Sequence, residues 1–475
     1  MKINNIDDVK ALLSQTDRKI FGIGITAYMR VLPALFLGKN FEILCYKNSI
    51  DNEILRKITK VHSLQENGEE IQKLSTADIL NSNYVKNLFT QEKEINLQVY
   101  KTTPEIEDFA VRNGYNIIGN SVENRDRYEN KKEFREILAS IGVETISGEN
   151  MNYDDFMVKN YDFFSQKYGN KIVIQLPDIT IGGGLGTIFI NSNEDFIKFK
   201  EKIAKQSYKN TKINSLNVTK FITGISSSIT GCATKFGTLS TKIQTQVIDI
   251  PEVISLKKGN GVFCGHDWSF KKYSDTVNKK ASEMIEKIGN FMYQNGYKGI
   301  FGLDLIVNEE EEQVYIVECN SRYTGAFPMI SFIDLKNSII PMDAFHIMEF
   351  LGIDYEIDFD KINSSYKYDK SGSHIILSNK NDDEITIKKD LIPGVYSFTG
   401  TEISYLREGI GYSDINSENE FIIIDGNPSS GEKIRGAGEL SRFCHLLFPF
   451  SIIENENTLN EKAKTIINII YKQYT

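Results

Sequence analysis

The sequence is poor in the residues that build metal centres and disulfide frameworks. Among its 475 residues there are five cysteines, scattered with no CxxC spacing, and five histidines, none of them in HExxH spacing. A zinc site or a disulfide framework would need such clusters. We therefore expect reduced thiols, as in a cytoplasmic protein.

Long apolar runs and an excess of positive charge are also missing. No stretch approaches the roughly 18 apolar residues of a membrane span. The first residues, MKINNIDDVK, hold no apolar core of the kind that a signal peptide has. The formal net charge is -9, whereas a nucleic-acid-binding domain is normally basic. These absences predict neither a membrane nor a nucleic-acid partner.

What is present is an ordinary globular composition. Hydrophobic residues make up 40% and charged residues 25%, and the length corresponds to two to four domains at roughly 100–200 residues each. In the first 120 residues, short apolar runs alternate with helical stretches, which predicts a parallel, doubly wound sheet. Its expected strands are 20–26, 41–46, 96–100 and 116–118, and its expected helices include 84–89 and 104–113.

Beyond residue 120 the pattern changes to α+β. A helix is expected at 130–141, and a small lid follows it, with strands at 171–177, 187–190 and 216–222 and a helix at 194–205. Further strands at 226–231, 236–239 and 242–250 precede a long amphipathic helix at 274–296 and a strand pair at 299–307 and 313–319. The rest of the chain is expected to be mostly β, with a closing helix at 459–472.

The most informative segment is 299–328, where two apolar strands flank the polar run NEEEEQ. A hairpin symmetric about residue 311 would place Asp304 opposite Glu318, both in a pair that is apolar on its two faces. The same register pairs Leu305 with Val317 and Ile306 with Ile316. Because like charges that face each other destabilise a sheet, buried carboxylates here need a cation or must be neutralised.

Two further polar side chains follow on the same strand. Asn320 and Arg322 continue the two-residue spacing from Glu318 and would project beside it. Two carboxylates and an amide oxygen are ligands suited to Mg²⁺ that carries phosphates, and a guanidinium can hold a carboxylate or a phosphoryl group. The alternative is a solvated edge at which Arg322 merely forms a salt bridge with the two acids.

A second unusual segment is a glycine cluster made of Gly182, Gly183, Gly184 and Gly186, followed by Thr187. Glycines let backbone N–H groups approach an anion closely. The cluster lacks the Lys-Ser/Thr of a Walker loop, and the β-rich run TIFI after it argues against a dinucleotide fingerprint, which needs a helix there. It is either a phosphate-binding loop or a plain flexible turn.

Asp304 and the run Glu318-Cys319-Asn320-Ser321-Arg322 resemble the D…ExNxR signature of the ATP-grasp superfamily. The form with arginine is similar to the biotin-carboxylase and amino-acid or peptide ligase branches. The resemblance implies that Asp304, Glu318 and Asn320 bind Mg²⁺ and that Arg322 stabilises an acyl phosphate. It also implies an α/β and α+β multidomain ATP-grasp fold, in which the glycine hairpin closes over the triphosphate of ATP.

The resemblance implies two parts over roughly residues 1–345. They are a Rossmann-like pre-ATP-grasp α/β domain at 1–120 and an ATP-grasp domain at 121–345 with its lid at about 145–222. The strand pattern of the remaining residues, 346–475, predicts a third, mostly β section with a helical tail.

The chain departs from the family at the nucleotide site. Gln175 stands where the family usually has a lysine that contacts phosphate and adenine, and the stretch 218–226 resembles the adenine hinge without its usual acids. The backbone of Lys220, Phe221 and Ile222 is expected to contact adenine. Three lysines are candidates for the missing cation: Lys131, Lys171 and Lys242. Lys131 resembles the lysine of the family's DK pair, and the alternative for it is a solvated helix face.

Candidate substrate-binding residues lie elsewhere in the chain. His266, in the run GVFCGHDW, either lines the acceptor pocket or belongs to a packed turn with an aromatic anchor. Arg407 and Arg435 lie among glycines in the C-terminal section and resemble loops of the biotin-carboxylase-like branch. They either bind a substrate carboxylate or occupy surface turns.

The expected activity is that of an ADP-forming ligase that uses ATP and Mg²⁺ to activate a small-molecule carboxylate as an acyl phosphate for attack by an amine. Two alternatives stay open. One is a biotin-carboxylase-like enzyme, which would need a separate carrier because no AMKM-type biotin attachment site is present. The other is a nucleotide-binding protein without catalysis. Members of this superfamily often form homodimers.

Overall fold

The computed structural model describes residues 1–475 except 17, 178–185, 256–260, 437–441 and 456. The N-terminal part forms a five-stranded, all-parallel sheet in the order β4-β3-β2-β5-β6. One face packs on α1 and α2 and the other on α4 to α6, which confirms the predicted doubly wound sheet. The elements are β2 (Lys19–Gly24), β3 (Phe41–Cys45), β4 (Val61–Ser63), β5 (Ile95–Gln98), β6 (Asn116–Ile118), α1 (Ile6–Leu13), α2 (Ala34–Leu37), α4 (Thr76–Asn81), α5 (Asn83–Phe89) and α6 (Pro104–Asn113).

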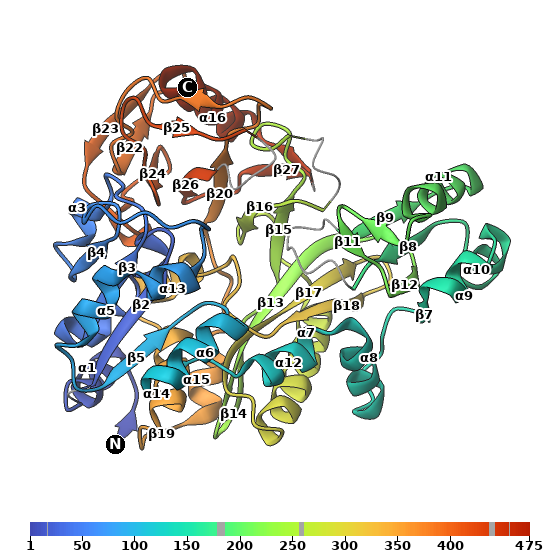
Figure 1. Ribbon diagram of the computed structural model, residues 1–475, viewed down its shortest axis with the longest axis horizontal. Helices are drawn as coiled ribbons and strands as arrows, with labels where there is room; N and C mark the ends of the chain where they lie inside the picture. Colours follow the sequence, from blue (N-terminus) through green and yellow to red (C-terminus); the bar gives the residue numbers. More distant parts are fainter. Residues whose placement is uncertain (17, 178–185, 256–260, 437–441, 456) are drawn as a thin grey trace.

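The lid is a separate lobe with its own apolar core, at the right of Figure 1. Its four-stranded antiparallel sheet has the order β7-β12-β8-β9. Three helices cover the sheet through an aromatic cluster of Phe156, Phe164 and Phe196. The elements are β7 (Gly148–Asn152), α9 (Tyr153–Met157), α10 (Tyr161–Tyr168), β8 (Ile172–Gln175), β9 (Thr187–Ile190), α11 (Asn193–Ile203) and β12 (Ser215–Lys220).

One large sheet runs from the middle of the chain into its C-terminal part. Its order is β18-β17-β13-β15-β16-β20-β26-β24-β22-β23, with β14 paired to β13. The antiparallel pairing of β16 with β20 connects the strands from the middle of the chain to those of the C-terminal part. The strands are β13 (Ile225–Thr234), β14 (Gly237–Ser240), β15 (Gln244–Ile248), β16 (Phe263–Asp267), β17 (Gly299–Asn308), β18 (Gln313–Asn320), β20 (Ser373–Ser378), β22 (Gly394–Phe398), β23 (Ile403–Arg407), β24 (Glu420–Ile424) and β26 (Arg442–Phe448).

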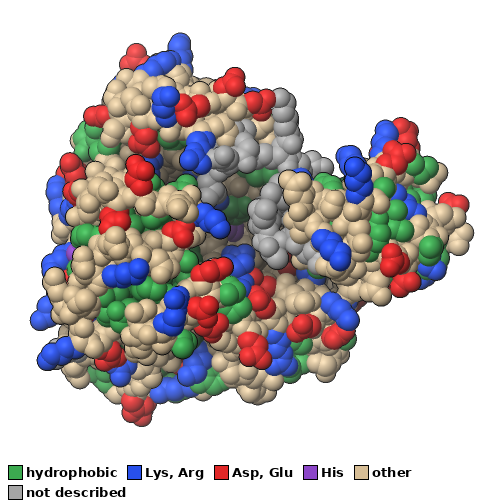
Figure 2. All heavy atoms as spheres, in the orientation of Figure 1, with side chains coloured by type: hydrophobic (Ala, Val, Ile, Leu, Met, Phe, Trp, Pro, Cys, Tyr) green, Lys and Arg blue, Asp and Glu red, His purple; other side chains and the backbone are tan. Residues whose placement is uncertain are grey.

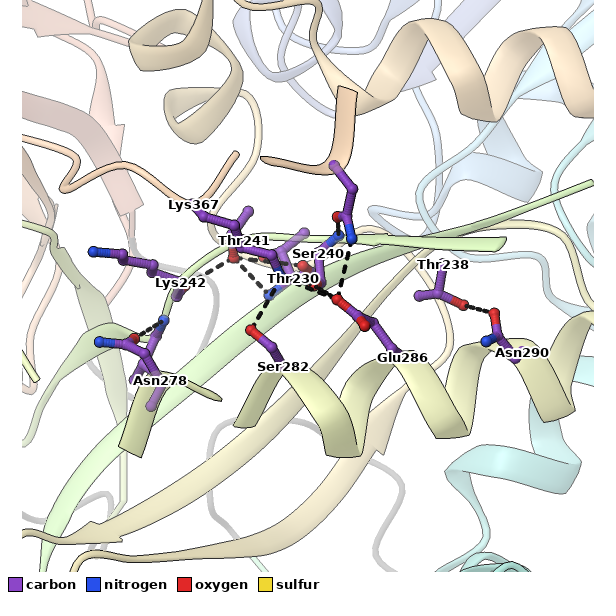
Figure 3. A network of polar contacts seen from close by, with 12 residues as sticks. Thr230, Thr238, Ser240, Thr241, Lys242, Asn278, Ser282, Glu286, Asn290 and Lys367 are labelled. Atoms are coloured by element: carbon purple, nitrogen blue, oxygen red, sulfur yellow. Dashed lines mark hydrogen bonds and ion pairs between the residues drawn. The ribbon is translucent and has the colours of Figure 1, made fainter. Parts of the chain in front are cut away.

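Helix α12 (Asp275–Gln294) covers one face of this sheet with the apolar stripe that its sequence predicts. A polar network then fixes the helix to β14 and to the segment after α15 (Phe359–Ser365), as Figure 3 shows. Lys367 Nζ donates to Ser282 Oγ at 3.0 Å and pairs with Glu286 at 3.2 Å, and Ser240 Oγ donates to Glu286 at 3.1 Å. These contacts join chain segments that lie 46 to 85 residues apart in the sequence.

Two buried helices connect the large sheet to the parallel sheet. α13 (Met329–Lys336) and α14 (Met342–Leu351) are almost wholly buried, and α14 contacts β13, β17 and β6. Two more helices, α7 (Val122–Glu129) and α8 (Lys131–Ser140), lead from the parallel sheet to the lid and lie against β18. Among the described residues, no helix is both long enough and apolar enough to span a membrane.

The hairpin of β17 and β18 pairs Asp304 with Glu318, as the sequence predicts. The neighbouring pairs differ from the prediction, because Leu305 faces Ile316 rather than Val317 and Ile306 faces Tyr315. Val317 is therefore an extra residue, a β-bulge that adds one position to β18.

The bulge decides which way Glu318 points. Ile316 is 4% exposed in the core under α12, and regular alternation would put Glu318 on that same face. The extra residue turns Glu318 to the opposite, open face. The prediction that both faces of the hairpin are apolar and buried is therefore wrong, since only one face packs against α12.

Replacing the two isoleucines one at a time tests this arrangement. Ile316→Thr puts a hydroxyl into the core and removes a methyl group, which should cost about 2–3 kcal/mol and lower the Tm by roughly 5–10 °C. Ile306→Thr, on the open face, should lower it by about 2 °C or less. Scanning calorimetry of both variants measures this. Equal losses would mean that the two side chains share a face and that the bulge is absent.

Candidate active site

A large cleft lies between the lid, the large sheet and the N-terminal part. Its volume is about 2430 Å³, compared with roughly 300–1,000 Å³ for a typical ligand pocket. Figure 2 shows the molecule hollowed between its body and the lid lobe. The cleft is large enough for more than one substrate, and all three parts of the chain contribute to its wall.

The facing carboxylates lie on the floor of this cleft. Asp304 Oδ1 accepts a hydrogen bond from Gln246 Nε2 at 3.0 Å, and Glu318 Oε2 lies 2.9 Å from Lys131 Nζ. Burial and the neighbouring Glu318 carboxylate raise the pKa of Asp304, whereas the Lys131 ammonium lowers the pKa of Glu318. Lys131 therefore compensates Glu318, whereas no cation among the described residues lies within ion-pair distance of Asp304.

Arg322 is held beside them from two sides. Its Nη2 donates to Asn320 Oδ1 at 2.7 Å, and its Nε lies 3.0 Å from Glu129 Oε1. Glu129 Oε2 also forms ion pairs with Arg125 Nη1 at 2.7 Å and with Lys101 Nζ at 3.2 Å. Arg322 pairs with Glu129 and not with the two acids of the hairpin, which is not what the solvated-edge alternative expects. No motif marks Glu129 in the sequence, and only the fold brings it to Arg322.

The oxygen atoms at this place fit a divalent cation that also binds phosphates. Asp304, Glu318 and Asn320 all line the cleft from one face of the hairpin. No group of three His, Cys, Asp or Glu side chains that could hold a metal occurs in the described part of the chain. A set of two carboxylates and one amide oxygen suits Mg²⁺, which keeps several water or phosphate ligands of its own. The incomplete compensation of Asp304 also favours a cation here.

The lid contributes Gln175, which is 7% exposed and accepts a hydrogen bond from Asn217 Nδ2 at 2.9 Å. Thr187 faces Gln175 across β8 and β9, and the Gly186 carbonyl accepts from the Leu176 N–H at 2.9 Å. Gly186 and Thr187 line the cleft. The other three loop residues, Gly182, Gly183 and Gly184, lie outside the described residues.

The hinge residues Lys220, Phe221 and Ile222 line the cleft. Two of their three amides are already engaged, because the Lys220 N–H donates to Ser147 at 2.8 Å and the Phe221 N–H to Lys171 at 3.3 Å. Within the described part of the chain, the Ile222 N–H has no such partner and stays available to a ligand.

Of the three candidate lysines, only Lys131 lines the cleft. Lys171 Nζ lies 5.5 Å from the centre of the Phe221 ring, and Lys242 pairs with Asp369 at 2.6 Å outside the cleft. A further cation was not among the candidates. Arg135, one helical turn after Lys131 on α8, donates to Asn217 Oδ1 at 3.4 Å beside Gln175. The spacing of four residues from Lys131 is the signal that could have identified it.

His266 lies in a central strand of the large sheet, not in a turn. It lines the cleft and is 2% exposed, with Nε2 3.2 Å from Ser228 Oγ and Nδ1 3.2 Å from His374 Nε2. Burial lowers the pKa of His266 to about 3, so the ring is neutral and acts through hydrogen bonds alone.

Arg407 and Arg435 are not among the described residues that line the cleft. Arg407, on strand β23 at the edge of the sheet, donates to Glu420 Oε2 and to the Asp414 carbonyl, both at 2.6 Å. The Arg435 carbonyl accepts from Asn379 Nδ2 at 2.9 Å. The C-terminal section instead brings Arg442 and His445, both from β26, into the cleft wall.

Asp304→Asn should stabilise the protein when no divalent cation is bound. The change removes one of two facing negative charges, so we expect the Tm in EDTA to rise by about 1–3 °C. MgCl₂ should raise the Tm of the wild type more than that of the variant. Glu310→Gln, in the exposed turn of the same hairpin, is the matched control and should change neither value. A lower Tm for Asp304→Asn in EDTA would show that the two carboxylates do not repel each other.

Comparisons with known proteins agree with this geometry. Residues 171–326 match the family described as the ATP-grasp domain. Among solved structures, the biotin carboxylase domain of Hydrogenobacter thermophilus 2-oxoglutarate carboxylase, bound to MgADP, ADP and bicarbonate, has a TM-score of 0.60. It is 15% identical over 91% of this chain and 86% of that one.

Two other similar structures are ligases or synthases. The N5-carboxyaminoimidazole synthase of Aspergillus clavatus, with ADP and 5-aminoimidazole ribonucleotide, has a TM-score of 0.54 at 13% identity, over 95% of this chain and 99% of that one. The phosphoribosylamine–glycine ligase of Thermotoga maritima has a TM-score of 0.56 and is 13% identical, over 96% of this chain and 97% of that one. At these identities the likeness concerns the fold. Residues 171–326 are therefore an ATP-grasp domain, and the chain as a whole has a fold like that of biotin carboxylase domains.

Proposed function

We propose that the protein is an ADP-forming ligase that joins a carboxylate to an amine at the expense of ATP. The observation that carries the proposal is the pair Asp304 and Glu318, which face the cleft together with Asn320 and Arg322. A protein that only binds a nucleotide has no need of an arginine held in place by Glu129 beside a cation site.

The first step is the transfer of the γ-phosphoryl group. A carboxylate oxygen of the substrate attacks phosphorus, the bond to the ADP oxygen breaks, and an acyl phosphate forms. Asp304, Glu318 and Asn320 would hold Mg²⁺, which supplies neutralisation of the phosphate charge. The similar structures that were solved with MgADP or ADP support this use of the site.

Arg322 is the residue that we assign to the transferring group. Glu129 and Asn320 fix two sides of its guanidinium, so it need not reorganise as charge develops on the phosphoryl oxygens. Lys131 and Arg135, on the same side of α8, add positive charge for the phosphates along the lid.

The second step is attack by the amine. The nitrogen bonds to the acyl carbon, the carbon–oxygen bond to phosphate breaks, and the nitrogen loses its proton. Water must be kept from the acyl phosphate meanwhile. The lid lobe is joined to the body at the ends of β7 and β12, an arrangement in which it can close over the cleft.

A second candidate function is carboxylation with bicarbonate as the activated carboxylate. It is favoured by the likeness to the biotin carboxylase domain that was solved with bicarbonate. The two candidates share the phosphoryl transfer and differ in the acid that is activated.

An ADP-release screen tests the proposal and separates the two candidates. Purified protein with MgATP is offered small carboxylic acids, amino acids and amines in pairs, with and without added bicarbonate. We expect ADP release that requires one acid and one amine together and does not depend on bicarbonate. Release that needs bicarbonate would support the carboxylating enzyme. No release under any condition, with tight MgATP binding, would support a protein without catalysis.

Arg322→Lys separates catalysis from nucleotide binding. The lysine keeps the charge but loses the planar pair of donors. We expect kcat to fall by roughly 10²-fold, the usual effect of losing a well-placed donor to a developing anion. The Kd for MgATP should stay within about threefold, because Asp304, Glu318 and Asn320 remain.

Arg112→Lys on α6, which lies outside the cleft, is the control for this substitution. Melting temperature, MgATP affinity and kcat are measured on one preparation. Lost stability and lost affinity with a normal kcat would make Arg322 a structural residue.

A further inference from the structure

Strand β26, at the C-terminal side of the cleft, contains a β-bulge like the one in β18. Its register against β20 pairs Leu377 with Cys444 and Ser378 with Arg442, which leaves Phe443 as the extra residue. Phe443 and Cys444 are both buried in the same apolar core. Arg442 and His445, on either side of them, both line the cleft. This is the arrangement that Val317 produces for Glu318, and bulges recur beside binding sites because they redirect side chains.

His445 is held in one orientation from behind. It is 1% exposed, and its Nδ1 lies 2.8 Å from Asp425 Oδ2. Burial would raise the pKa of Asp425, but the hydrogen bond from His445 and the other polar contacts of the carboxylate outweigh it, and the pKa lies below its ordinary value. The carboxylate is therefore charged, Nδ1–H donates to it, and Nε2 is left for a ligand. No hydrogen bond to Nε2 from the described residues is present.

Asp425 is itself fixed by an unusual backbone. Its φ of 77° lies in the left-handed region, which residues other than glycine seldom adopt. The two following amides, of Gly426 and Asn427, donate to the buried carboxylate of Asp51 at 3.2 and 3.1 Å. Lys47 Nζ donates to the Gly426 carbonyl at 2.7 Å. The N-terminal part of the chain thus holds the loop that orients His445.

Arg442 supplies a positive charge that forms no ion pair with another described residue. In the described part of the chain no carboxylate lies within ion-pair distance of its guanidinium, and its electrostatic partners are Asp425 and Cys264. Arg407, in contrast, is paired with Glu420. A charged guanidinium that lines a cleft and forms no ion pair with the described residues is suited to an anionic ligand group.

A series of ring contacts links the subsite to the loop that follows Arg322, although several strands separate them. The His445 and His374 rings are 5.6 Å apart between centroids, and the His374 and Phe263 rings 6.3 Å. The Phe263 ring in turn lies 2.6 Å from where a Cβ on Gly325 would be, three residues after Arg322. Strand β26 is therefore linked to the loop that carries Arg322 through His374 on β20 and Phe263 on β16.

We propose that Arg442 and His445 form a subsite for an amine substrate that carries an anionic group near its nitrogen, as an amino acid does. Arg442 pairs with the anion, and His445 Nε2 accepts a hydrogen bond from the nitrogen. The inference rests on the proposed ligase and names the class of its second substrate. The anion is a carboxylate or a phosphate, which share this chemistry.

Matched pairs of amines test the subsite in the ADP-release assay. Glycine is compared with methylamine, L-alanine with ethylamine, and O-phosphoethanolamine with ethanolamine. The wild type should use the anionic member at least about tenfold better in kcat/KM. Arg442→Met should raise the KM for that member by roughly 10- to 100-fold and leave the KM for ATP and for the uncharged partner unchanged. Equal discrimination in wild type and Arg442→Met would overturn the proposal.

Two further variants sharpen the result. Asp425→Asn removes the charge behind His445 while keeping a side chain that tolerates a φ of 77°. It should raise the amine KM at unchanged KM for ATP and unchanged Tm. Arg407→Met, in the same C-terminal section but outside the cleft, should behave as wild type.

Direct binding separates failure of the subsite from failure of the ligase. If no amine supports ADP release, the ligase proposal fails. Calorimetry with glycine, L-alanine and O-phosphoethanolamine on wild type and Arg442→Met then decides the subsite. Binding to the wild type that Arg442→Met loses supports it. Binding to neither protein, or equally to both, overturns it.

Discussion

Two carboxylates that face each other on adjacent strands repel each other. Several residues around Asp304 and Glu318 are placed so that they offset this repulsion. Together with burial, the neighbouring Glu318 carboxylate raises the pKa of Asp304 to about 7. Lys131 and Gln246 reach the pair from α8 and β15 and offset part of the repulsion. What remains is an excess of negative charge on an open face. Such a pair lowers the stability of the sheet. Its arrangement is suited to binding a cation that also binds phosphate.

The pairing of Asp304 with Glu318 was predictable from the sequence, but for an incomplete reason. The turn is one residue shorter than a hairpin symmetric about residue 311, since Asn308 pairs with Gln313, and Val317 adds the residue back. The shorter turn and the bulge cancel at the pair of Asp304 and Glu318. The pairs between this one and the turn are each shifted by one residue. A bulge depends on which face each side chain prefers in three dimensions, and a short alternating run does not reveal where the alternation is broken.

Other parts of the site had no local signal. The run FCGHD looks like a turn because of its glycine, yet β16 is central and Gly265 is needed there, since a Cβ would meet the His374 carbonyl at 1.9 Å. The run RFCHLLF is apolar on both faces around its bulge. Its pattern therefore does not identify Arg442 and His445 as residues of the cleft. Glu129 and Asp425 act on residues 193 and 20 positions away, at Arg322 and His445, a relation that only the tertiary fold creates. The parallel sheet, the lid strands and the long helix α12 were predictable, because their apolar spacing is regular over many residues.

The large sheet has a consequence for the order in which the protein is made. β26 is inserted between β20 and β24 in the interior of the sheet, although it is the eleventh of the eleven strands in chain order. A ribosome therefore releases the half of the cleft that contains Asp304 and Glu318 before the strand that carries Arg442 and His445. Until that strand arrives, β20 is an open edge, and the loop that holds Asp425 has its contacts with Asp51 and Lys47 but none with His445. A nascent or truncated chain thus lacks the wall that would receive a second substrate, so the assembly of the last strand acts as a checkpoint on the completeness of the molecule.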